Sequence, residues 1–238
     1  MDESSYTQNQ AAKWGISREA QDAFALESQQ RAARAIAEGR FKSQIVPITL
    51  QSRKGDVLFD TDEHPKATSL EALAKMKAAF KKEGGTVTAG NASGINDGAA
   101  FLVLADAAAA ARGGHQPMAR LVAHAVAGVE ARIMGDGPIP SVQLALKRAG
   151  LTLDQIDVIE ANEAFAAQAL AVAQGLGLDP AKTNPNGGAI ALGHPVGATG
   201  AVIVTKLLHE MQRTNARYGL ATMCIGGGQG ITTIWERC

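Results

Sequence analysis

The sequence has 238 residues, of which 46% are hydrophobic and only 4% aromatic. Its 23 basic residues balance its 23 acidic residues, so the zero formal charge gives no sign of a nucleic-acid-binding surface. Two cysteines, no secretory signal and no bilayer-length apolar run argue against a disulfide scaffold and a membrane protein, and predict a cytoplasmic protein.

The N-terminal part of the chain predicts two helices and one short strand. Ser17 suits a helix N-cap, and apolar residues at helical spacing extend the first helix to about residue 38. Residues 45–50 are β-rich, although Pro47 favours an edge strand, and residues 55–64 predict a loop. Residues 69–82 predict a second amphipathic helix.

From Gly84 onward, glycine-rich turns alternate with short apolar runs. The predicted strands are a buried one at 99–104 and others at 118–128, 157–160, 220–225 and 231–235. The predicted helices are an alanine-rich one after residue 104 and others at 140–150, 163–175 and 197–215. Strands that alternate with helices predict a layered α/β fold.

Three segments in the second half carry polar side chains just after strands or before helices. They are residues 162–165 (Asn-Glu-Ala-Phe), the glycine-rich loop 186–200 around His194, and residues 224–228 (Cys-Ile-Gly-Gly-Gly). Sites in open α/β sheets form in such positions. Each residue also has a simpler interpretation, because Asn162 suits a helix N-cap, His194 a structural histidine and Cys224 a buried inert thiol.

Together these segments resemble the three C-terminal signatures of thiolases in order and spacing, and residues 88–98 (Thr-Ala-Gly-Asn-Ala-Ser-Gly-Ile-Asn-Asp-Gly) resemble a fourth. The resemblance extends from about residue 8 to residue 237 and is strongest to biosynthetic and broad-range bacterial β-ketothiolases. It implies the thiolase fold, layered α/β/α/β/α, represented here by the C-terminal half and most of the loop domain. Residues 1–94 would form the loop domain that covers coenzyme A, residues 95–116 the returning end of the N-terminal half, and residues 117–238 the C-terminal half.

The resemblance also implies catalytic roles. Cys224 would move the α-proton of the second acyl-CoA, a task that needs a thiol pKa near the working pH. His194 would activate the nucleophile and help to hold a thioester oxygen, and Asn162 would position a water in the same oxyanion hole. The backbone N–H of Gly226 would serve a second oxyanion hole.

Five further residues would contact coenzyme A, which is a substrate here; the resemblance implies no separate cofactor and no metal. Ser93 matches the contact to the pantetheine arm, and Met134, Ala164 and Phe165 match the lining of the pantetheine tunnel. Lys66 falls where the family often has an arginine near the nucleotide end. The segment around Lys66 is one residue shorter than the common pattern, and lysine offers a point charge instead of a bidentate fork.

The family's nucleophilic cysteine has no counterpart, because no cysteine precedes Cys224. Cys238, the last residue, is a poor substitute. The expected activity is acyl-CoA C-acyltransferase chemistry, meaning reversible Claisen condensation of acyl-CoA units and CoA-dependent thiolysis of 3-ketoacyl-CoA. The nucleophile would come from the N-terminal thiolase half, in the same or a separate chain of a dimer or tetramer, and this chain alone would be inactive.

Other interpretations stay open at this stage. The chain could be a fragment, a subunit of a split enzyme or a truncated gene product. A truncated thiolase could serve as a non-catalytic CoA-binding or assembly subunit, although the joint presence of Asn162, His194 and Cys224 favours catalysis. A ketoacyl synthase relative would use two histidines with its nucleophile, whereas this sequence has a single Gly-His-Pro loop.

Overall fold

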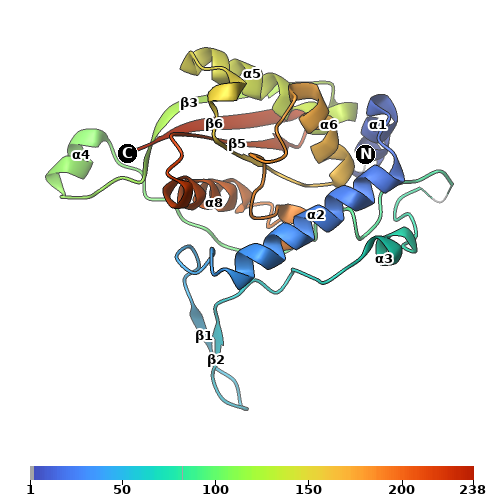
Figure 1. The fold of residues 1–238 in the computed structure, drawn as a ribbon, viewed down its shortest axis with the longest axis horizontal. Helices are drawn as coiled ribbons and strands as arrows, with labels where there is room; N and C mark the ends of the chain where they lie inside the picture. Colours follow the sequence, from blue (N-terminus) through green and yellow to red (C-terminus); the bar gives the residue numbers. More distant parts are fainter. Residues whose placement is uncertain (1–2, 82) are drawn as a thin grey trace.

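The computed structural model describes residues 3–81 and 83–238. Its centre is a four-stranded mixed sheet with the strand order β3-β6-β5-β4 (Figure 1). The strand β6 (Gln229–Arg237) pairs in antiparallel with β3 (Ala119–Gly128) on one side and with β5 (Tyr218–Ile225) on the other, and β4 (Val158–Ala161) pairs with β5 in parallel. The parallel pair brings the carboxyl ends of β4 and β5 to the same edge of the sheet.

Helices cover both faces of this sheet, giving three layers (Figure 1). On one face, α5 (Pro138–Ala149) and α6 (Ala166–Leu176) enclose a core that includes the fully buried Leu220 and Ile234. On the other face, α8 (Thr199–Thr214) buries Leu207 and Met211 against the strands. Short helices connect the layers: η1 (Ala131–Asp136), η2 (Leu153–Gln155) and α7 (Ala189–Leu192).

The N-terminal residues form a separate set of elements beside the sheet. Helix α1 (Glu3–Trp14) packs on η1 and α6, and α2 (Arg18–Ala37) packs on α6, α7 and α3 (Leu70–Ala74). The hairpin of β1 (Ile48–Leu50) and β2 (Val57–Phe59) and the short helix α4 (Ala107–Arg112) project from the body (Figure 1). Within residues 3–81 and 83–238, every helix falls short of the length or the hydropathy that a bilayer-spanning segment requires.

Most predicted elements are confirmed. The Ser17 side chain accepts a hydrogen bond from the Ala20 N–H at 3.1 Å and caps α2 as expected. Helix α5 ends at Gly150 in the left-handed conformation, although it begins at Pro138, two residues before Pro140. The strand at 118–128, the last two strands and the helix at 197–215 are also present. Helices α1 and α7 were not predicted from the sequence.

The predicted helix at 69–82 is wrong beyond its first turn, since α3 ends at Ala74; Lys82 lies outside the described residues. The guanidinium of Arg18 donates to the Leu73 carbonyl at 2.6 Å and to the Met76 carbonyl at 3.1 Å. A longer helix would need both carbonyls for its own ladder. The Ala79 N–H instead bonds the Val87 carbonyl, so tertiary contacts override the local pattern.

Two other predictions are wrong because a strand forms only where another segment pairs with its backbone hydrogen-bonding groups. Residues 99–104 form no strand and are mostly exposed; Phe101 is 88% and Val103 98% accessible, because no described segment pairs with them. Conversely, the loop predicted at 55–64 contains β2, which finds an antiparallel partner in β1.

The helix predicted from Glu163 begins three residues later, at Ala166. Phe165 forms a β-bridge with Ala92, and the Ser93 N–H donates to the Ala164 carbonyl at 3.0 Å. These contacts hold residues 164–165 extended, and Phe165 occupies the N-cap position. The interpretation of Asn162 as a helix N-cap is therefore wrong.

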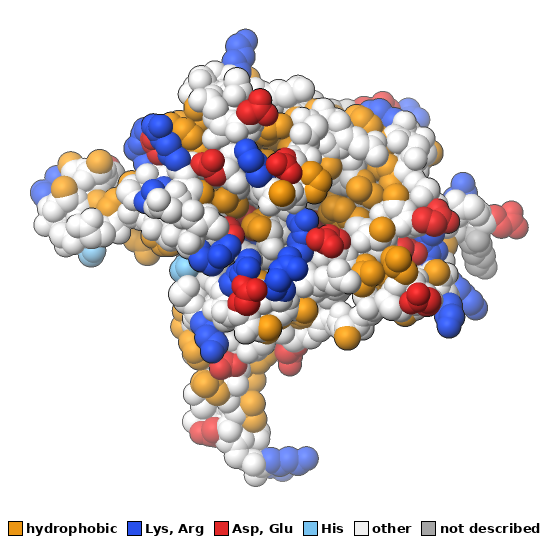
Figure 2. Space-filling view, viewed as in Figure 1, with side chains coloured by type: hydrophobic (Ala, Val, Ile, Leu, Met, Phe, Trp, Pro, Cys, Tyr) orange, Lys and Arg blue, Asp and Glu red, His pale blue; other side chains and the backbone are white. Residues whose placement is uncertain are grey.

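The exposed apolar residues predict that the isolated chain does not persist as a monomer. Figure 2 shows hydrophobic side chains along the projecting hairpin, where Ile48, Val57 and Leu58 are each more than half exposed. A two-stranded hairpin is marginal in water without further packing. Sedimentation velocity over a range of concentrations should show self-association, or a bound partner.

Replacing Phe101 and Val103 together by serine should reduce this association, whereas Ala108→Ser on the exposed helix α4 should not. A monodisperse monomer that unfolds in one cooperative transition would contradict the prediction.

Candidate active site

The parallel pair β4–β5 brings two predicted catalytic residues to one edge of the sheet. Asn162 directly follows β4, and its backbone N–H donates to the Thr222 carbonyl of β5 at 3.0 Å. Cys224 lies two residues further along β5 and is half-buried. Asn162 is 4% exposed, and its Nδ2 lies 3.4 Å from Nε2 of His194. Asn162 therefore lies beside His194 and beside the strand that carries Cys224, and the catalytic roles of the three residues stay predictions.

His194 is held from its backbone and from both ring nitrogens. Its N–H donates to Oδ1 of Asn96 at 3.2 Å, and His194 itself forms an isolated parallel β-bridge with Ile95. Its Nδ1 lies 2.7 Å from Oγ1 of Thr199, opposite the contact of Nε2 with Asn162. The imidazole is thus fixed in orientation, as a general base requires.

Asn96 and Thr199 were missed as site residues. Both lie inside segments that the sequence singles out, residues 88–98 and 186–200, but neither had an assigned role. Asn96 also contacts His64, with its Nδ2 3.3 Å from Nδ1 of that ring. Burial, followed by the nearby charge of Lys66, lowers the pKa of His64. Their position inside these motifs was the only sequence signal for Asn96 and Thr199. Their contacts with His194 depend on how the loops run in space.

Glu163, the neighbour of Asn162, joins three segments behind the site. Its carboxylate accepts hydrogen bonds from the Ser28 hydroxyl at 2.6 Å, the Asn184 amide at 2.9 Å and the Ile190 N–H at 3.3 Å. Burial raises the pKa of Glu163, and these donors oppose the rise. A Cβ at Gly188 would collide with the same carboxyl, so only glycine lets the loop pass. Glu163 therefore fixes the loop that leads to His194 relative to Asn162.

A buried ion pair supports the same loop from the strand side. Lys206 of α8 donates to Oε2 of Glu160 at 2.7 Å and to the Gly187 carbonyl at 2.7 Å. Both side chains are almost fully buried. Burial raises the pKa of Glu160 to about 7, because it outweighs the attraction of Lys206.

Gly226 lies in the exposed turn after β5, close in sequence to Cys224. The turn is bonded to the segment that follows β3 by a 2.7 Å hydrogen bond from the Val129 N–H to the Gly228 carbonyl. Gly228 has a φ of +90°, and a Cβ there would collide with the Val129 carbonyl. The structure thus places Gly226 near the end of the strand that carries Cys224; its oxyanion role stays a prediction.

Only some of the residues predicted to contact coenzyme A lie close to one another in the structure. Ser93 lies beside Ala164 through their backbone hydrogen bond, and the Phe165 ring meets Phe80 edge-on at 6.4 Å. Met134 is half-buried on η1, which packs against α6. Lys66 has an exposed side chain and is held through its N–H to Gln29 at 3.0 Å. No described contact joins Lys66 to the other four, so its role rests on the resemblance alone.

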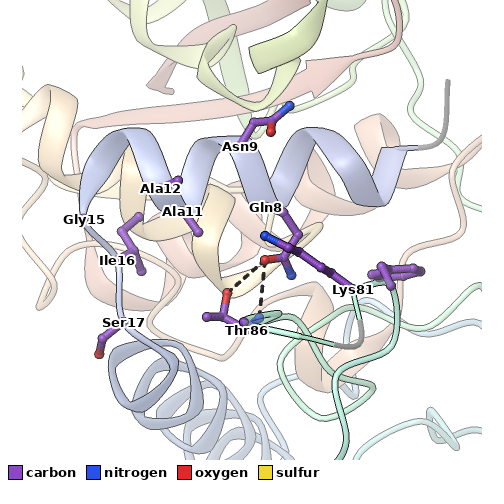
Figure 3. A pocket seen from close by; sticks show the side chains of 11 residues that line it. Gln8, Asn9, Ala11, Ala12, Gly15, Ile16, Ser17, Lys81 and Thr86 are labelled. Atoms are coloured by element: carbon purple, nitrogen blue, oxygen red, sulfur yellow. Dashed lines mark hydrogen bonds between the residues drawn. The ribbon is translucent and has the colours of Figure 1, made fainter.

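A cavity of about 720 Å³ lies elsewhere, between α1 and a segment that contributes Phe80, Lys81, Gly84 and Thr86 (Figure 3). Gln8 of α1 accepts a hydrogen bond from the Thr86 N–H at 3.3 Å across it, and Lys81 lies at its edge. None of the predicted catalytic or coenzyme A-contacting residues lines this cavity. A smaller groove of about 450 Å³ runs between residues 96–100 and the Pro195–Ala201 segment that follows His194.

Two family profiles match consecutive parts of the sequence. The family described as "Thiolase, N-terminal domain" matches residues 4–108, and "Thiolase, C-terminal domain" matches residues 115–237. The chain belongs to the thiolase family. The thiolase-domain matches do not test the three-part division at residues 94 and 116, which stays a prediction.

Proteins similar in sequence to this chain include a β-ketothiolase and acetyl-CoA acetyltransferases. "Beta-ketothiolase BktB" of Cupriavidus necator is 58% identical over 231 residues, which is 97% of this chain and 59% of that protein. "Acetyl-CoA acetyltransferase" of Syntrophomonas wolfei is 56% identical over 225 residues, which is 94% of this chain and 57% of that protein. The chain therefore spans less than two thirds of the length of these relatives.

Solved structures confirm the predicted thiolase fold. The crystal structure of the Bacillus anthracis acetyl-CoA acetyltransferase matches with a TM-score of 0.97 at 46% identity, covering 100% of this chain and 60% of that one. Human mitochondrial 3-ketoacyl-CoA thiolase in complex with CoA matches with a TM-score of 0.90 at 44% identity, covering 98% and 58%.

The raised pKa of Glu160 predicts a pH-dependent stability. A carboxyl that binds its proton more tightly when folded contributes fully below its unfolded pKa of 4.5, and the contribution is lost as the pH rises through about 7. The shift corresponds to on the order of 3 kcal/mol. Glu160→Gln should flatten this part of the pH dependence of the free energy of unfolding, measured by urea denaturation.

Glu130→Gln, at an exposed carboxyl, is the matched control and should leave the slope unchanged. An unaltered slope in Glu160→Gln would show that Glu160 has no raised pKa in the folded protein.

Proposed function

We propose that this chain carries the α-proton chemistry and an oxyanion hole of an acyl-CoA C-acyltransferase. The observation that supports it most is the placement of Asn162 and Cys224 at the shared edge of β4 and β5, with His194 bonded to Asn162. A proton-transferring thiol, an imidazole and an amide donor at one edge suit Claisen chemistry on thioesters. The similarity to a β-ketothiolase and to a thiolase solved in complex with CoA supports acyl-CoA substrates.

In the proposed reaction a nucleophilic cysteine attacks the thioester carbonyl of the first acyl-CoA. The bond to the CoA sulfur breaks, and His194 transfers the nucleophile's proton to the departing CoA thiolate. The Cys224 thiolate then takes a proton from the α-carbon of the second acyl-CoA. The resulting carbanion attacks the acyl group, the new carbon–carbon bond forms, and the nucleophile leaves as a thiolate.

The oxyanion contacts follow from the same arrangement. His194 and a water positioned by Asn162 would hold one thioester oxygen, and the Gly226 N–H would hold the other. Ser93, Ala164, Phe165 and Met134 would contact the pantetheine arm, and Lys66 would lie near the nucleotide end.

The nucleophile would come from sequence beyond these 238 residues. Of the two cysteines present, Cys224 has the proton-transfer role and Cys238 is the exposed last residue. We propose that the N-terminal half of a thiolase, on the same or a separate polypeptide, packs with this chain in a dimer or tetramer. The chain alone would then be inactive, and its location would be the cytoplasm.

Substitution of Cys224 tests the proposal. Cys224→Ala should abolish exchange of the α-protons of acetyl-CoA with deuterated solvent, because no other thiol at this edge can act as the base. NMR of acetyl-CoA incubated with the assembled enzyme measures the exchange.

Cys238→Ala removes the chain's other thiol and is the matched control, with exchange expected at the wild-type rate. Undiminished exchange in Cys224→Ala would refute the role. Wild-type protein that binds CoA without any exchange would instead indicate a non-catalytic CoA-binding subunit.

A further inference from the structure

The hydroxyl of Thr199 connects the His194 ring to the backbone at the start of α8. Its Oγ1 lies 2.7 Å from Nδ1 of His194 and 2.9 Å from the carbonyl oxygen of Pro195. Thr199 is 2% exposed, and its own N–H also bonds the Pro195 carbonyl, at 2.9 Å. The hydroxyl therefore lies between the Pro195 carbonyl, which can only accept a hydrogen bond, and Nδ1 of His194, which donates or accepts depending on the tautomer of the ring.

A threonine hydroxyl has a single proton to donate. The Pro195 carbonyl can only accept, so the 2.9 Å contact is a hydrogen bond only if Thr199 donates to it. This back-bond to the residue four positions earlier is a common arrangement for threonine at a helix. Oγ1 then faces His194 with a lone pair, and Nδ1 must carry a proton to bond it.

The other ring nitrogen agrees with this assignment. Nδ2 of Asn162 lies 3.4 Å from Nε2 of His194, and an amide nitrogen donates and never accepts. Nε2 must therefore present a lone pair to Asn162. Three hydrogen bonds form together: from Nδ1 to Thr199, from Thr199 to Pro195, and from Asn162 to Nε2.

The opposite tautomer makes fewer hydrogen bonds, although the Pro195 carbonyl would still accept from the backbone N–H groups of Ala198 and Thr199. If Nε2 carried the proton, Asn162 would have to turn its amide, and Thr199 would donate to Nδ1 instead of to Pro195. Two hydrogen bonds would then replace three, and the buried Asn162 amide would have its nitrogen where its oxygen now lies without a partner among the described residues.

We propose that Thr199 is a positioning residue that holds neutral His194 in the Nδ1–H tautomer, so that the Nε2 lone pair points toward Asn162. This inference rests on the proposed function for its consequence. When the nucleophile replaces the Asn162 amide at the single lone pair of Nε2, Nε2 can take the nucleophile's proton, and the N–H so formed becomes a donor for the thioester oxygen. Thr199 continues to accept from Nδ1 when the ring is charged, which stabilises the imidazolium.

The ring ¹⁵N chemical shifts of His194 report the tautomer directly. The assembled protein, labelled at its histidines, is measured at a pH where His194 is neutral, and His194→Gln identifies the signal among the chain's five histidines. The wild type should show Nδ1–H. A wild-type signal for Nε2–H would overturn the inference without the need for any variant.

Three variants separate the hydroxyl from its methyl group. Thr199→Val removes the hydroxyl and should lose the single tautomer, with kcat lowered about ten- to a hundred-fold and KM little changed. Thr199→Ser keeps the hydroxyl and should restore the Nδ1–H signal and most of kcat. Thr205→Val makes the same change on the same helix, where the hydroxyl bonds no described residue, and should leave the signal unchanged.

A Thr199→Val protein with the wild-type tautomer and kcat would refute the role of Thr199. The two proposals can fail separately. An Nδ1–H signal combined with undiminished α-proton exchange in Cys224→Ala would leave this inference intact and refute the proposed function.

Discussion

Parallel pairing of β4 with β5 determines where the chemistry of this chain can lie. Val158 pairs with Gly219 and Ala161 with Thr222, so both strands deliver their next residues to one edge of the sheet. In the antiparallel pairs of the same sheet, successive strands end at opposite edges. Asn162 and Cys224 can therefore share a site although 61 sequence positions separate them, and the loop of α7 has only to bring His194 to that edge.

Buried acidic side chains hold the loops behind this edge. Glu163 gathers donors from α2, from Asn184 and from α7, while Glu160 is paired with Lys206. Burial of carboxylates is costly, and the cost is offset only while every donor stays in place. The N-terminal elements are therefore coupled to the loop that carries His194, because Ser28 of α2 is one of those donors. A small displacement of α2 would therefore shift the position of His194.

The sequence predicts the second half of the chain better than the first, and the reason is physical. Elements there follow local periodicity and pack on one another, so the strands and α8 appear where expected. The failures depend on distant partners: Arg18 takes the carbonyls that would continue α3, and residues 99–104 have no described strand to pair with. The motif residues were identifiable from the sequence, whereas the hydrogen bonds of Asn96 and Thr199 to His194 depend on how two loops cross.

The central proposal is that two thiols have different roles, one accepting the acyl group and Cys224 transferring the proton. Peptide mapping by mass spectrometry, after brief incubation of the assembled enzyme with acetyl-CoA and acid quenching, tests it most directly. The account predicts an acetyl group on a cysteine outside these 238 residues, with Cys224 and Cys238 unmodified. Acetylation of Cys224 would contradict it, because Cys224 would then be the nucleophile, and a complete lack of acetylation would contradict covalent acyl transfer.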